Sequence, residues 1–538
     1  MPARPRKRTQ LTHADEALGA SEATGTVPPA TSSQPEARRR KSTSSRATLG
    51  IDPNRSTRGT SPLSSAGRAA GEAWSLSAPR QGAAQRNVRG PGRAVLSARL
   101  AVPATFDRDE RAFVAAPDRR LLDEGYLLAD YLIETSDDPW KAAVHFCREQ
   151  STALWRRVGV DEDYRPRHAA LVVDLTVESE GRPCSVPALA RPGQKFRRLH
   201  LRIAHPALNF GARIPNLLTA LCGEGAFFTP HVPLVLLEDV QFPASFLEQF
   251  EGPRFGIEGI RAVLGVKSRP IFCGVIKPNI GMPIEPFAEL ACQALRGGAD
   301  IVKDDEMLAD TDYAPLAARA ACVFPRVRDA SRETGERKLY LVNITDEVAR
   351  LGDLYDTVAS LGGASAACML NAMPIGLSAA RMIAARGRMP LFAHFDMIAS
   401  CSRVPYHGIS SLVWTRLQRL AGFDAIIMPG LSDRMNVTVA QVLRDMAACV
   451  EPMGAIRPAL PMPGGSDWAG TLQTMYETFK TVDFGVVPGR GIFGHPSGPA
   501  AGARSLRDAW ACIAQGLDPR DPAHQSPPLA EAFKEFGP

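Results

Sequence analysis

At 538 residues the chain is long enough for two or three domains that each bury a core. Its composition, 45% hydrophobic and 22% charged, is ordinary for a soluble protein, and no run of about 20 apolar residues predicts a membrane-spanning helix. The net charge is +6, but the first 95 residues hold 16 Lys and Arg against six Asp and Glu, which leaves a net charge of −4 on the rest. The sequence therefore argues against a membrane protein and against nucleic-acid binding by the folded part.

The ten cysteines are spread singly along the chain, and no two of them form a C-x-x-C pair. A zinc site or a redox motif is therefore not expected. Several cysteines lie in apolar runs, which indicates buried, reduced thiols. We interpret the chain as a cytoplasmic protein, because acidic residues weaken the similarity of its Arg- and Ser-rich start to a transit peptide.

Residues 1–95 are rich in Ser, Arg, Ala, Gly and Pro and show no sustained hydrophobic periodicity. Such a segment buries too little apolar surface to offset its ordering entropy, so we predict a disordered basic tail. Its basic run at residues 38–41 could touch nucleic acid or an acidic surface, but a solvated tail is the favoured interpretation.

Residues 96–250 have the mixed pattern of a small α+β domain. The alternation at residues 125–133 predicts a strand, residues 140–158 an amphipathic helix, and residues 169–175 a buried strand.

Residues 251–520 are more regular, and eight short apolar runs alternate there with helical stretches. The runs are residues 271–276, 299–302, 339–344, 367–370, 391–395, 425–428, 459–462 and 484–487. Eight successive β-α units over this length predict a (β/α)₈ barrel. An open, doubly wound sheet is the alternative from periodicity alone, and residues 521–538 are expected to form a C-terminal tail.

Polar or glycine-bearing turns follow nearly every expected strand, where barrel enzymes carry their functional residues. Helix caps explain many of these turns, because β-α loops favour Asp, Ser, Thr and Asn, but they do not explain lysines after the first two strands. Lys277 ends the first strand and is followed by proline. This lysine either extends to the barrel mouth or is partly desolvated for acid–base chemistry, and the sequence does not distinguish the two.

Lys303 is followed by three consecutive carboxylates, Asp304, Asp305 and Glu306. Adjacent carboxylates repel one another unless a cation lies between them, and oxygen ligands of this kind suit Mg²⁺. As an isolated tetrapeptide, K-D-D-E is more often a charged surface patch. Its place after an apolar run favours a metal site with Asp305 and Glu306 as ligands.

Two glycine-rich turns follow the seventh and eighth expected strands. They contain Gly464 and Gly465 in the first turn, and Gly489, Arg490 and Gly491 in the second. Barrels frequently bind a phosphate at these two turns through backbone N–H groups, and an arginine adds a charged donor. The turns therefore predict a phosphorylated small-molecule substrate.

Three segments resemble signature segments of the RuBisCO large-subunit superfamily. They are residues 274–278 (G-V-I-K-P), 297–306 (G-G-A-D-I-V-K-D-D-E) and 494–498 (G-H-P-S-G). The resemblance runs in order from about residue 121 to residue 516, and it includes an α+β domain before the barrel.

The resemblance implies a role for five side chains of the barrel. Lys303 would carry a carbamate and bind Mg²⁺ together with Asp305 and Glu306. Lys277 and His394 would be catalytic residues, and the two glycine-rich turns would bind phosphate. The family's minimal unit is a homodimer with the active site at the interface, and Glu149 and Trp155 match the segment that closes the partner's site.

The departures from the family pattern limit the chemistry that the resemblance implies. The differing residues are Asn279, Phe395, Ile427, Glu224 and Leu154, and the loop after the sixth strand, residues 430–434, holds no lysine. These changes remove a second phosphate contact and the lysine that addresses CO₂ in carboxylases. The chain is therefore similar to a RuBisCO-like protein (form IV) that keeps the enolising half of the site.

The expected activity is Mg²⁺-dependent formation of an enediolate from a sugar-acid or ketose monophosphate. Segments 223–230 and 250–259 are most similar to the branch that decarboxylates or hydrolytically cleaves 3-oxo-isoapionate 4-phosphate. A methylthio-ribulose-phosphate enolase or isomerase, a ribulose-bisphosphate carboxylase and a non-catalytic scaffold stay open as alternatives.

Overall fold

The structure, a computed structural model, describes residues 99–153 and 162–537. The basic segment predicted to be disordered and Trp155 both lie outside these residues. The N-terminal part is an α+β unit around a five-stranded sheet, with the helices α1 (Arg108–Arg111), α2 (Pro139–Glu149), α3 (Arg165–His168), α4 (Ile214–Cys222), α5 (Gly225–Phe228) and α6 (Ala244–Leu247). The sheet order is β10-β4-β1-β3-β2, made by β1 (Tyr126–Thr135), β2 (Leu171–Arg182), β3 (Phe196–Pro206), β4 (Leu234–Gln241) and β10 (Gly408–Ile409).

The central strands of this sheet are antiparallel, since β1 pairs with β3 on one side and with β4 on the other. The strand β10 belongs to a much later part of the chain and pairs in parallel with β4. The strands expected at residues 125–133 and 169–175 are confirmed as β1 and β2.

The predicted helix over residues 140–158 is too long, because α2 ends at Glu149. It begins where the Asp138 side chain accepts hydrogen bonds from the backbone N–H groups of Trp140 and Lys141. Just after its end, the Ser151 hydroxyl donates to the carbonyl of Cys147 at 2.6 Å. Such local side-chain bonds compete with helix continuation, which a hydrophobic periodicity does not register.

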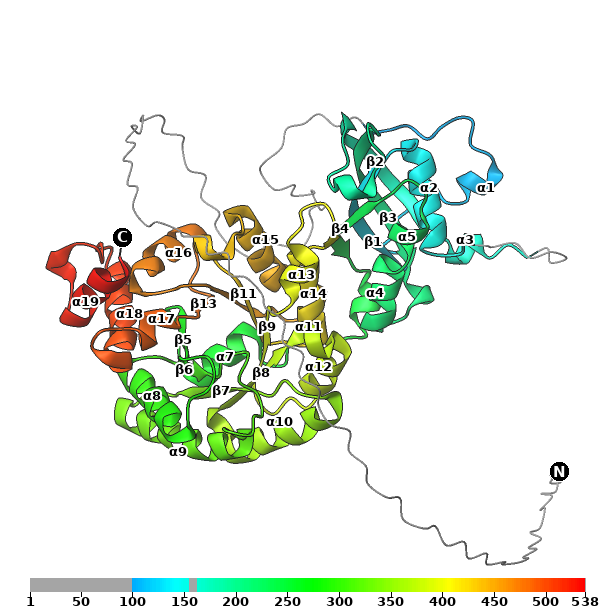
Figure 1. Ribbon diagram of the computed structural model, residues 1–538. Coiled ribbons are helices and arrows are strands. Elements are labelled where there is room, and N and C mark those ends of the chain that lie inside the picture. Colours follow the sequence, from blue (N-terminus) through cyan, green and yellow to red (C-terminus); the bar gives the residue numbers. More distant parts are fainter. Residues whose placement is uncertain (1–98, 154–161, 538) are drawn as a thin grey trace, which may run out of the picture. The chain divides into compact units, whose positions relative to one another are not determined.

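The predicted (β/α)₈ barrel is confirmed, with all eight expected strands in place (Figure 1). They are β5 (Ile271–Val275), β6 (Ile301–Lys303), β7 (Leu339–Asn343), β8 (Ala366–Asn371), β9 (Leu391–His394), β11 (Ala425–Pro429), β12 (Leu460–Gly464) and β13 (Gly485–Val486). The last strand, β13, pairs in parallel with the first, β5. Because first and last strands are neighbours, the sheet curls into a barrel, and the open doubly wound alternative is wrong.

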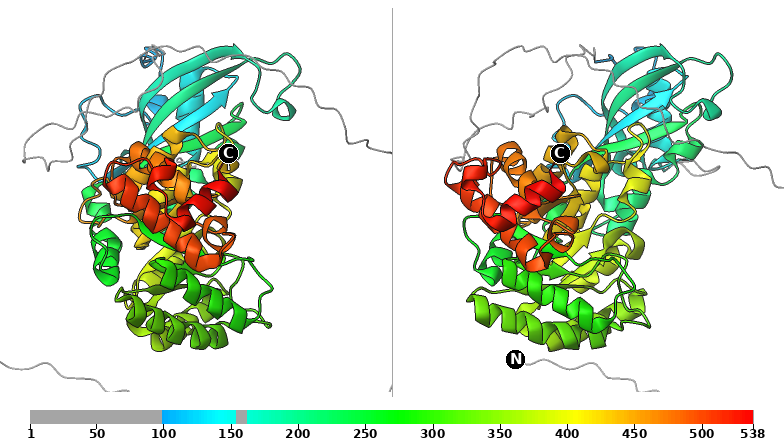
Figure 2. Two further views of the ribbon diagram at one scale, coloured as in Figure 1. Left: turned by 90° about the vertical axis from the view of Figure 1, so that its left-hand side faces the viewer. Right: turned by 60° about the vertical axis from the view of Figure 1, so that its left-hand side comes forward.

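Helices surround the strands on the outside of the barrel (Figure 1). The longer ones are α8 (Ile284–Gly297), α9 (Leu316–Thr334), α10 (Val348–Gly362), α12 (Leu377–Ala384), α14 (Ser411–Ala421), α15 (Val439–Val450), α16 (Leu472–Phe479) and α18 (Gly498–Ala514). A further helix, α19 (Pro527–Phe536), lies within the segment expected to be a tail and packs on α18 (Figure 2). Among the described residues, no helix combines the length and apolar character that crossing a membrane requires.

The strands are apolar on both faces, as expected for a parallel sheet covered by helices. One set of side chains, including Ile301, Leu341 and Ile427, fills the barrel interior. The alternate set, including Val302 and Tyr340, packs against the surrounding helices. Helix α7 (Gly256–Leu264) contributes Ile260 and Leu264 to the interior cluster, so it closes the end of the barrel where the strands begin.

Candidate active site

The two-residue repeat of the strands decides which polar side chains reach the barrel mouth. Positions of the same parity as the interior residues continue the inward row at the carboxyl end of each strand. This inward row contains Lys277, Lys303, Asp305, Asn343, Asn371, His394, Gly464 and Gly489. The closed barrel therefore gathers residues that lie up to about 200 positions apart in the sequence.

Two lysine–carboxylate pairs form the centre of the site. Lys277 donates through Nζ to Oδ2 of Asp305 at 2.7 Å and to Oδ1 of Asn279 at 2.8 Å. Lys303, which is fully buried, donates to Oε2 of Glu306 at 3.1 Å and to the carbonyl of Asp304 at 2.8 Å. The structure thus brings together both predicted lysines and both predicted metal-binding carboxylates.

His394 completes this cluster from the end of β9. Its Nε2 lies 3.4 Å from Oε2 of Glu306, and its Nδ1 lies 3.5 Å from Oδ1 of Asp396. Burial by itself would raise the pKa of Glu306, but the charges of Lys303 and then of His394 hold that pKa at about 2. Glu306 is therefore a carboxylate at any physiological pH, as a metal ligand must be.

Asp304 does not belong to the acidic cluster, and the prediction of three mutually repelling carboxylates was wrong for this residue. It points outward from the barrel, where Nη2 of Arg319 lies 3.1 Å from its Oδ2. The hydroxyl of Tyr340 and the backbone N–H of Asn343 also donate to its carboxylate. The pleat sends adjacent residues to opposite faces of a strand, so Asp304 and Asp305 never share an environment.

Two asparagines at expected strand ends, to which the sequence assigned no role, fix the loop that carries the carboxylates. Asn343 Nδ2 donates to the carbonyl of Glu306 at 2.9 Å, and Asn371 Nδ2 donates to the same carbonyl at 3.0 Å. Among the described residues, Oδ1 of Asn371 and Nδ1 of His394 are buried atoms without a hydrogen-bond partner. A polar residue at the inward parity of a strand end was the signal that could have identified both asparagines.

The two predicted phosphate turns lie against each other and against Lys277. A Cβ placed on Gly464 would lie 3.0 Å from Cβ of Val487, and one on Gly489 would lie 2.8 Å from Cε of Lys277. A side chain at Gly464 would press on Val487, and one at Gly489 would displace the flexible end of Lys277. The turn after β13 is therefore adjacent to Lys277.

A buried carboxyl group, Asp467, joins these two turns. The backbone N–H of Val487 donates to its Oδ2 at 3.3 Å, and the backbone of Gly465 donates to it as well. Burial raises the pKa of Asp467 to about 6 despite these donors. This contact fixes the spacing of the two turns.

Arg490 and Gly491, which follow Gly489 in the second turn, do not face Lys277. Arg490 faces α19, with Nη2 3.8 Å from Oε1 of Glu535 and its guanidinium 5.2 Å from the ring centre of Phe536. Gly491 is buried, and a Cβ there would lie 2.4 Å from the backbone oxygen of Asp467. Gly491 thus serves close packing of the turns, and a phosphate contact by Arg490 stays a prediction.

Glu149 lies at the end of α2, where its Oε1 is 3.4 Å from Nε2 of His145. It lines a hollow of the α+β unit together with Glu224 and His205. Its predicted role in closing a partner's site stays a prediction, as does that of Trp155.

Two departures from the family pattern place apolar side chains in and below the mouth. The ring of Phe395 stacks on that of His394 with centroids 4.6 Å apart. Ile427 is buried in the barrel interior. The loop after β11 is tied to the neighbouring turn, because Arg434 donates to Oγ of Ser466 at 3.1 Å. Phe395 and Ile427 offer no cation, and the guanidinium of Arg434 is held by Ser466.

The residues at the mouth fit Mg²⁺ if Lys303 carries a carbamate. Within residues 99–153 and 162–537, no group of three His, Cys, Asp or Glu side chains is placed to hold a metal. Asp305 and Glu306 supply two carboxylates, and each contacts a lysine ammonium where a cation is favoured. A carbamate on Lys303 would replace that ammonium by a third oxygen donor, which gives the ligand type that Mg²⁺ prefers.

Comparison with known proteins identifies the family. Residues 256–536 match the model of the ribulose bisphosphate carboxylase large chain, catalytic domain. The chain is 54% identical over 414 residues to ribulose bisphosphate carboxylase-like protein 2 of Rhodopseudomonas palustris, covering 77% of this chain and 95% of that protein. It belongs to the RuBisCO large-chain family.

Other members of the RuBisCO family show how far the similarity extends. The RuBisCO-like protein of Chlorobaculum tepidum is 53% identical over 422 residues, covering 78% of this chain and 96% of that protein. The crystal structure of a RuBisCO-like protein from Burkholderia fungorum has a TM-score of 0.69 at 30% identity, covering 77% of this chain and 100% of that one.

The enzymes named for 3-oxo-isoapionate 4-phosphate are more distant from this chain. The transcarboxylase/hydrolase of Xanthobacter autotrophicus is 31% identical, covering 75% of this chain and 98% of that protein. The decarboxylase of Rhizobium etli is 30% identical, covering 76% and 97%. The predicted similarity to this branch is therefore real but weaker than that to RuBisCO-like proteins without a substrate in their names.

Proposed function

We propose that this RuBisCO-like chain is a Mg²⁺-dependent enzyme that enolises a sugar acid or ketose carrying one phosphate. The observation that carries the proposal is the pairing of Lys277 with Asp305 and of Lys303 with Glu306 at the mouth of the barrel. Burying a charged lysine beside carboxylates costs folding free energy, because the charges lose their hydration. Such clusters are therefore concentrated at functional sites. A scaffold that merely kept the fold would have no use for them.

The side chains of these two pairs have separate tasks in this proposal. Asp305, Glu306 and a carbamate on Lys303 would hold Mg²⁺, which acts as a Lewis acid toward a substrate oxygen when bound. Lys277 lies beside the glycine turn after β13, so its amine can hold or move a proton next to a phosphate-anchored substrate. Its contact with Asp305 keeps the amine oriented at the mouth.

A carboxylase acting on a bisphosphate is not the function that we propose. Phe395 takes the place of the arginine expected beside His394, and its ring packs on the imidazole rather than offering a donor. Residues 430–434 provide no lysine for CO₂. One phosphate contact, at the two glycine turns, therefore supports a monophosphate substrate.

Two substrate classes follow from the proposal. A phosphorylated 3-oxo acid such as 3-oxo-isoapionate 4-phosphate is our first candidate, because loss of CO₂ from a β-keto acid leaves the enediolate that the site is built to stabilise. The second is a methylthio-ribulose phosphate. Its apolar substituent would match Phe395 and the exposed side chains of Met307, after β6, and Met397, after β9.

We further propose a homodimer in which Glu149 and Trp155 reach the partner's barrel. Among the structural relatives, one RuBisCO of Hyperthermus butylicus is described as dimeric and one of Pyrococcus horikoshii as octameric. Light scattering of the purified chain tests this expectation, and a monomer at micromolar concentration would contradict it.

The deciding experiment follows the exchange of substrate C–H protons with deuterated solvent, with and without Mg²⁺. Phosphorylated 3-oxo acids, methylthio-ribulose phosphate and ribulose bisphosphate are tested in turn, and CO₂ release is recorded in parallel. We expect Mg²⁺-dependent exchange or CO₂ release with a monophosphate, and a loss of at least about 10²-fold in Lys277→Met and Lys303→Met. Lys195→Met, at an exposed site of the α+β unit, is the matched control.

Two outcomes would contradict the proposal. Turnover of ribulose bisphosphate with CO₂ fixation would restore the carboxylase. Absence of exchange and CO₂ release with every monophosphate would favour the scaffold.

A further inference from the structure

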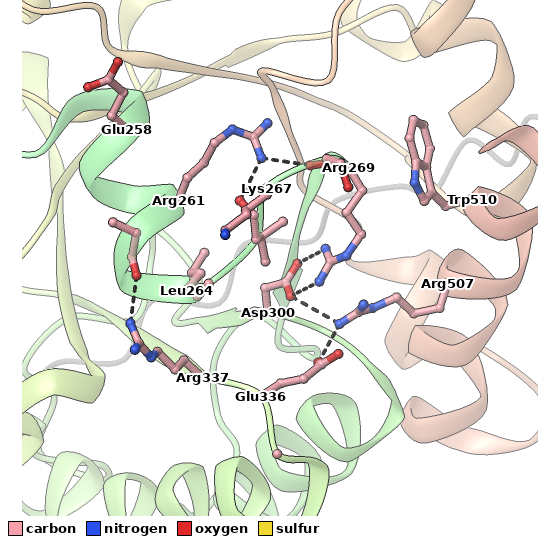
Figure 3. Close-up of a pocket in the computed structure, with 15 residues that line it drawn as sticks. Glu258, Arg261, Leu264, Lys267, Arg269, Asp300, Glu336, Arg337, Arg507 and Trp510 are labelled. Atoms are coloured by element: carbon pink, nitrogen blue, oxygen red, sulfur yellow. Dashed lines mark hydrogen bonds and ion pairs between the residues drawn. The ribbon is translucent and has the colours of Figure 1, made fainter.

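A second hollow lies at the end of the barrel opposite to the candidate active site, where the strands begin (Figure 3). Arg269 stands just before β5, Asp300 just before β6 and Arg337 just before β7, and α18 adds Arg507. The hollow has a volume of about 930 Å³ and is also bounded by the end of α7. None of its residues takes part in the site at the mouth.

Positive charge exceeds negative charge around this hollow. Its lining contains five cationic side chains and three carboxylates: Arg261, Lys267, Arg269, Arg337 and Arg507, against Glu258, Asp300 and Glu336. The excess is two positive charges in a concave surface, where the field of like charges is focused.

The buried carboxylate of Asp300 is already fully used by two arginines. Arg269 contacts both of its oxygens at 2.6 Å, and Nη2 of Arg507 lies 3.3 Å from Oδ1 (Figure 3). Burial lowers the pKa of Arg507, and the neighbouring charge of Arg269 lowers it further, against the attraction of Asp300. The carboxylates of Asp300 and Glu336 thus hold the two guanidiniums in place, and the unpaired cations of the hollow lie elsewhere in its lining.

Two further cations have no carboxylate of their own. In the described part of the chain, neither Lys267 nor Arg337 forms an ion pair, and Arg337 uses only Nη1, which donates to the carbonyl of Ala262 at 2.9 Å. Figure 3 shows Lys267 on the α7 side of Asp300 and Arg337 below it. A ligand between them would meet the ammonium of Lys267 and the remaining guanidinium N–H groups of Arg337.

The rigidity of the arginines distinguishes this hollow from an ordinary charged surface. Arg269 and Arg507 both lie against the ring of Phe272, with guanidinium carbons 5.3 and 5.9 Å from its centre. Arg507 is also fixed by Glu336 at 2.7 Å and by the carbonyl of Gly298 at 2.6 Å. Arg269 and Arg507 therefore supply a fixed positive field, and Lys267 and Arg337 are the donors available to a ligand.

We propose that this hollow is a binding site for a small anion with at least two negative charges, of the phosphate or pyrophosphate class. Charge-assisted bonds from Lys267 and Arg337, with the field of Arg269 and Arg507 behind them, provide the affinity. The ligand binds remote from the mouth, so the inference is independent of the proposed reaction. The competing interpretation is that these cations only stabilise the lower end of the barrel.

Calorimetric titration of the full chain with pyrophosphate, at constant ionic strength, tests the proposal. We expect saturable binding at one site per chain, weakened about tenfold in Lys267→Ala and in Arg337→Ala. Lys195→Ala and Arg444→Ala remove exposed cations elsewhere and should leave the affinity unchanged. Lys277→Met should also leave it unchanged, because the phosphate turns at the mouth are separate.

Three results of the pyrophosphate titration would overturn the inference, and a fourth comes from the comparison with citrate. They are no saturable heat up to about 10 mM pyrophosphate, an equal loss in the control variants, and loss of binding in Lys277→Met alone, which would place the anion at the mouth. Inorganic phosphate and citrate are titrated alongside. Citrate binding more tightly than pyrophosphate would contradict the assigned ligand class.

Discussion

The charge of Asp304 should stabilise the fold without serving the reaction, although it stands in the same tetrapeptide as the candidate metal ligands. Its carboxylate accepts hydrogen bonds from Nε and Nη2 of Arg319 at 3.3 and 3.1 Å and from the Asn343 backbone at 3.0 Å. Both members of the ion pair are fully buried. The isosteric substitution Asp304→Asn removes the charge and keeps the volume.

The expected cost follows from what remains around Arg319. Removing one partner of a buried ion pair leaves the other charge uncompensated and costs about 3–5 kcal/mol. Arg319 keeps hydrogen bonds to the carbonyls of Ala309 and Ala314, so we expect a loss near the lower limit, about 3 kcal/mol. Arg319→Met should cost a similar amount. The double variant should lose much less than the sum, because each single change already breaks the same pair.

Urea unfolding followed by tryptophan fluorescence and circular dichroism measures these losses as shifts of the transition midpoint. Glu333→Gln, which breaks the exposed pair with Arg296, is the control and should leave the midpoint unchanged. Folded Asp304→Asn protein should keep Mg²⁺-dependent exchange. The reasoning is refuted if Asp304→Asn loses less than about 1 kcal/mol, if the two single losses add, or if exchange disappears while stability is kept.

Further predictions concern a buried acid and the two glycine turns. Burial raises the pKa of Asp445 from its usual 3.8 to about 7, so stability should fall as the pH rises from about 4 through about 7. Asp445→Asn should therefore raise the melting temperature at pH 8 but not at pH 4, and equal shifts at both pH values would contradict this. Gly491→Ala should cost about 1–3 kcal/mol in urea unfolding, because its Cβ meets the backbone of Asp467. Gly489→Ala meets only the flexible end of Lys277, so it should slow exchange at nearly unchanged melting temperature, and the reverse pattern would contradict the assignment.

Much of the fold was predictable because it rests on local pattern. Eight apolar runs with helical stretches between them are enough to indicate β-α units, and a strand end is marked by the first polar residue. Lys277 and Lys303 could be recognised because a lysine at such a place has no role in capping a helix. The glycines of the last two turns could be recognised because a glycine-rich turn after a strand offers its own backbone N–H groups to a phosphate, whatever the rest of the fold supplies.

The length of α2 was not predictable in the same way. Periodicity continues past Glu149, but the helix stops where the Ser151 hydroxyl takes the carbonyl of Cys147. A hydrogen bond of this kind depends on the side-chain rotamer and not on the hydrophobic pattern.

The candidate metal site shows most clearly which features the sequence determines and which features depend on the tertiary structure. The sequence by itself determined that Lys303, Asp305 and Glu306 stand at the end of a strand, since composition and spacing are properties of the chain. Only the tertiary structure separated Asp304 from them, because the pleat turns it toward Arg319 on α9. Likewise, barrel closure brought Asn371 to the carbonyl of Glu306, 65 positions earlier in the chain. Contacts across that distance arise from packing, which no local pattern encodes.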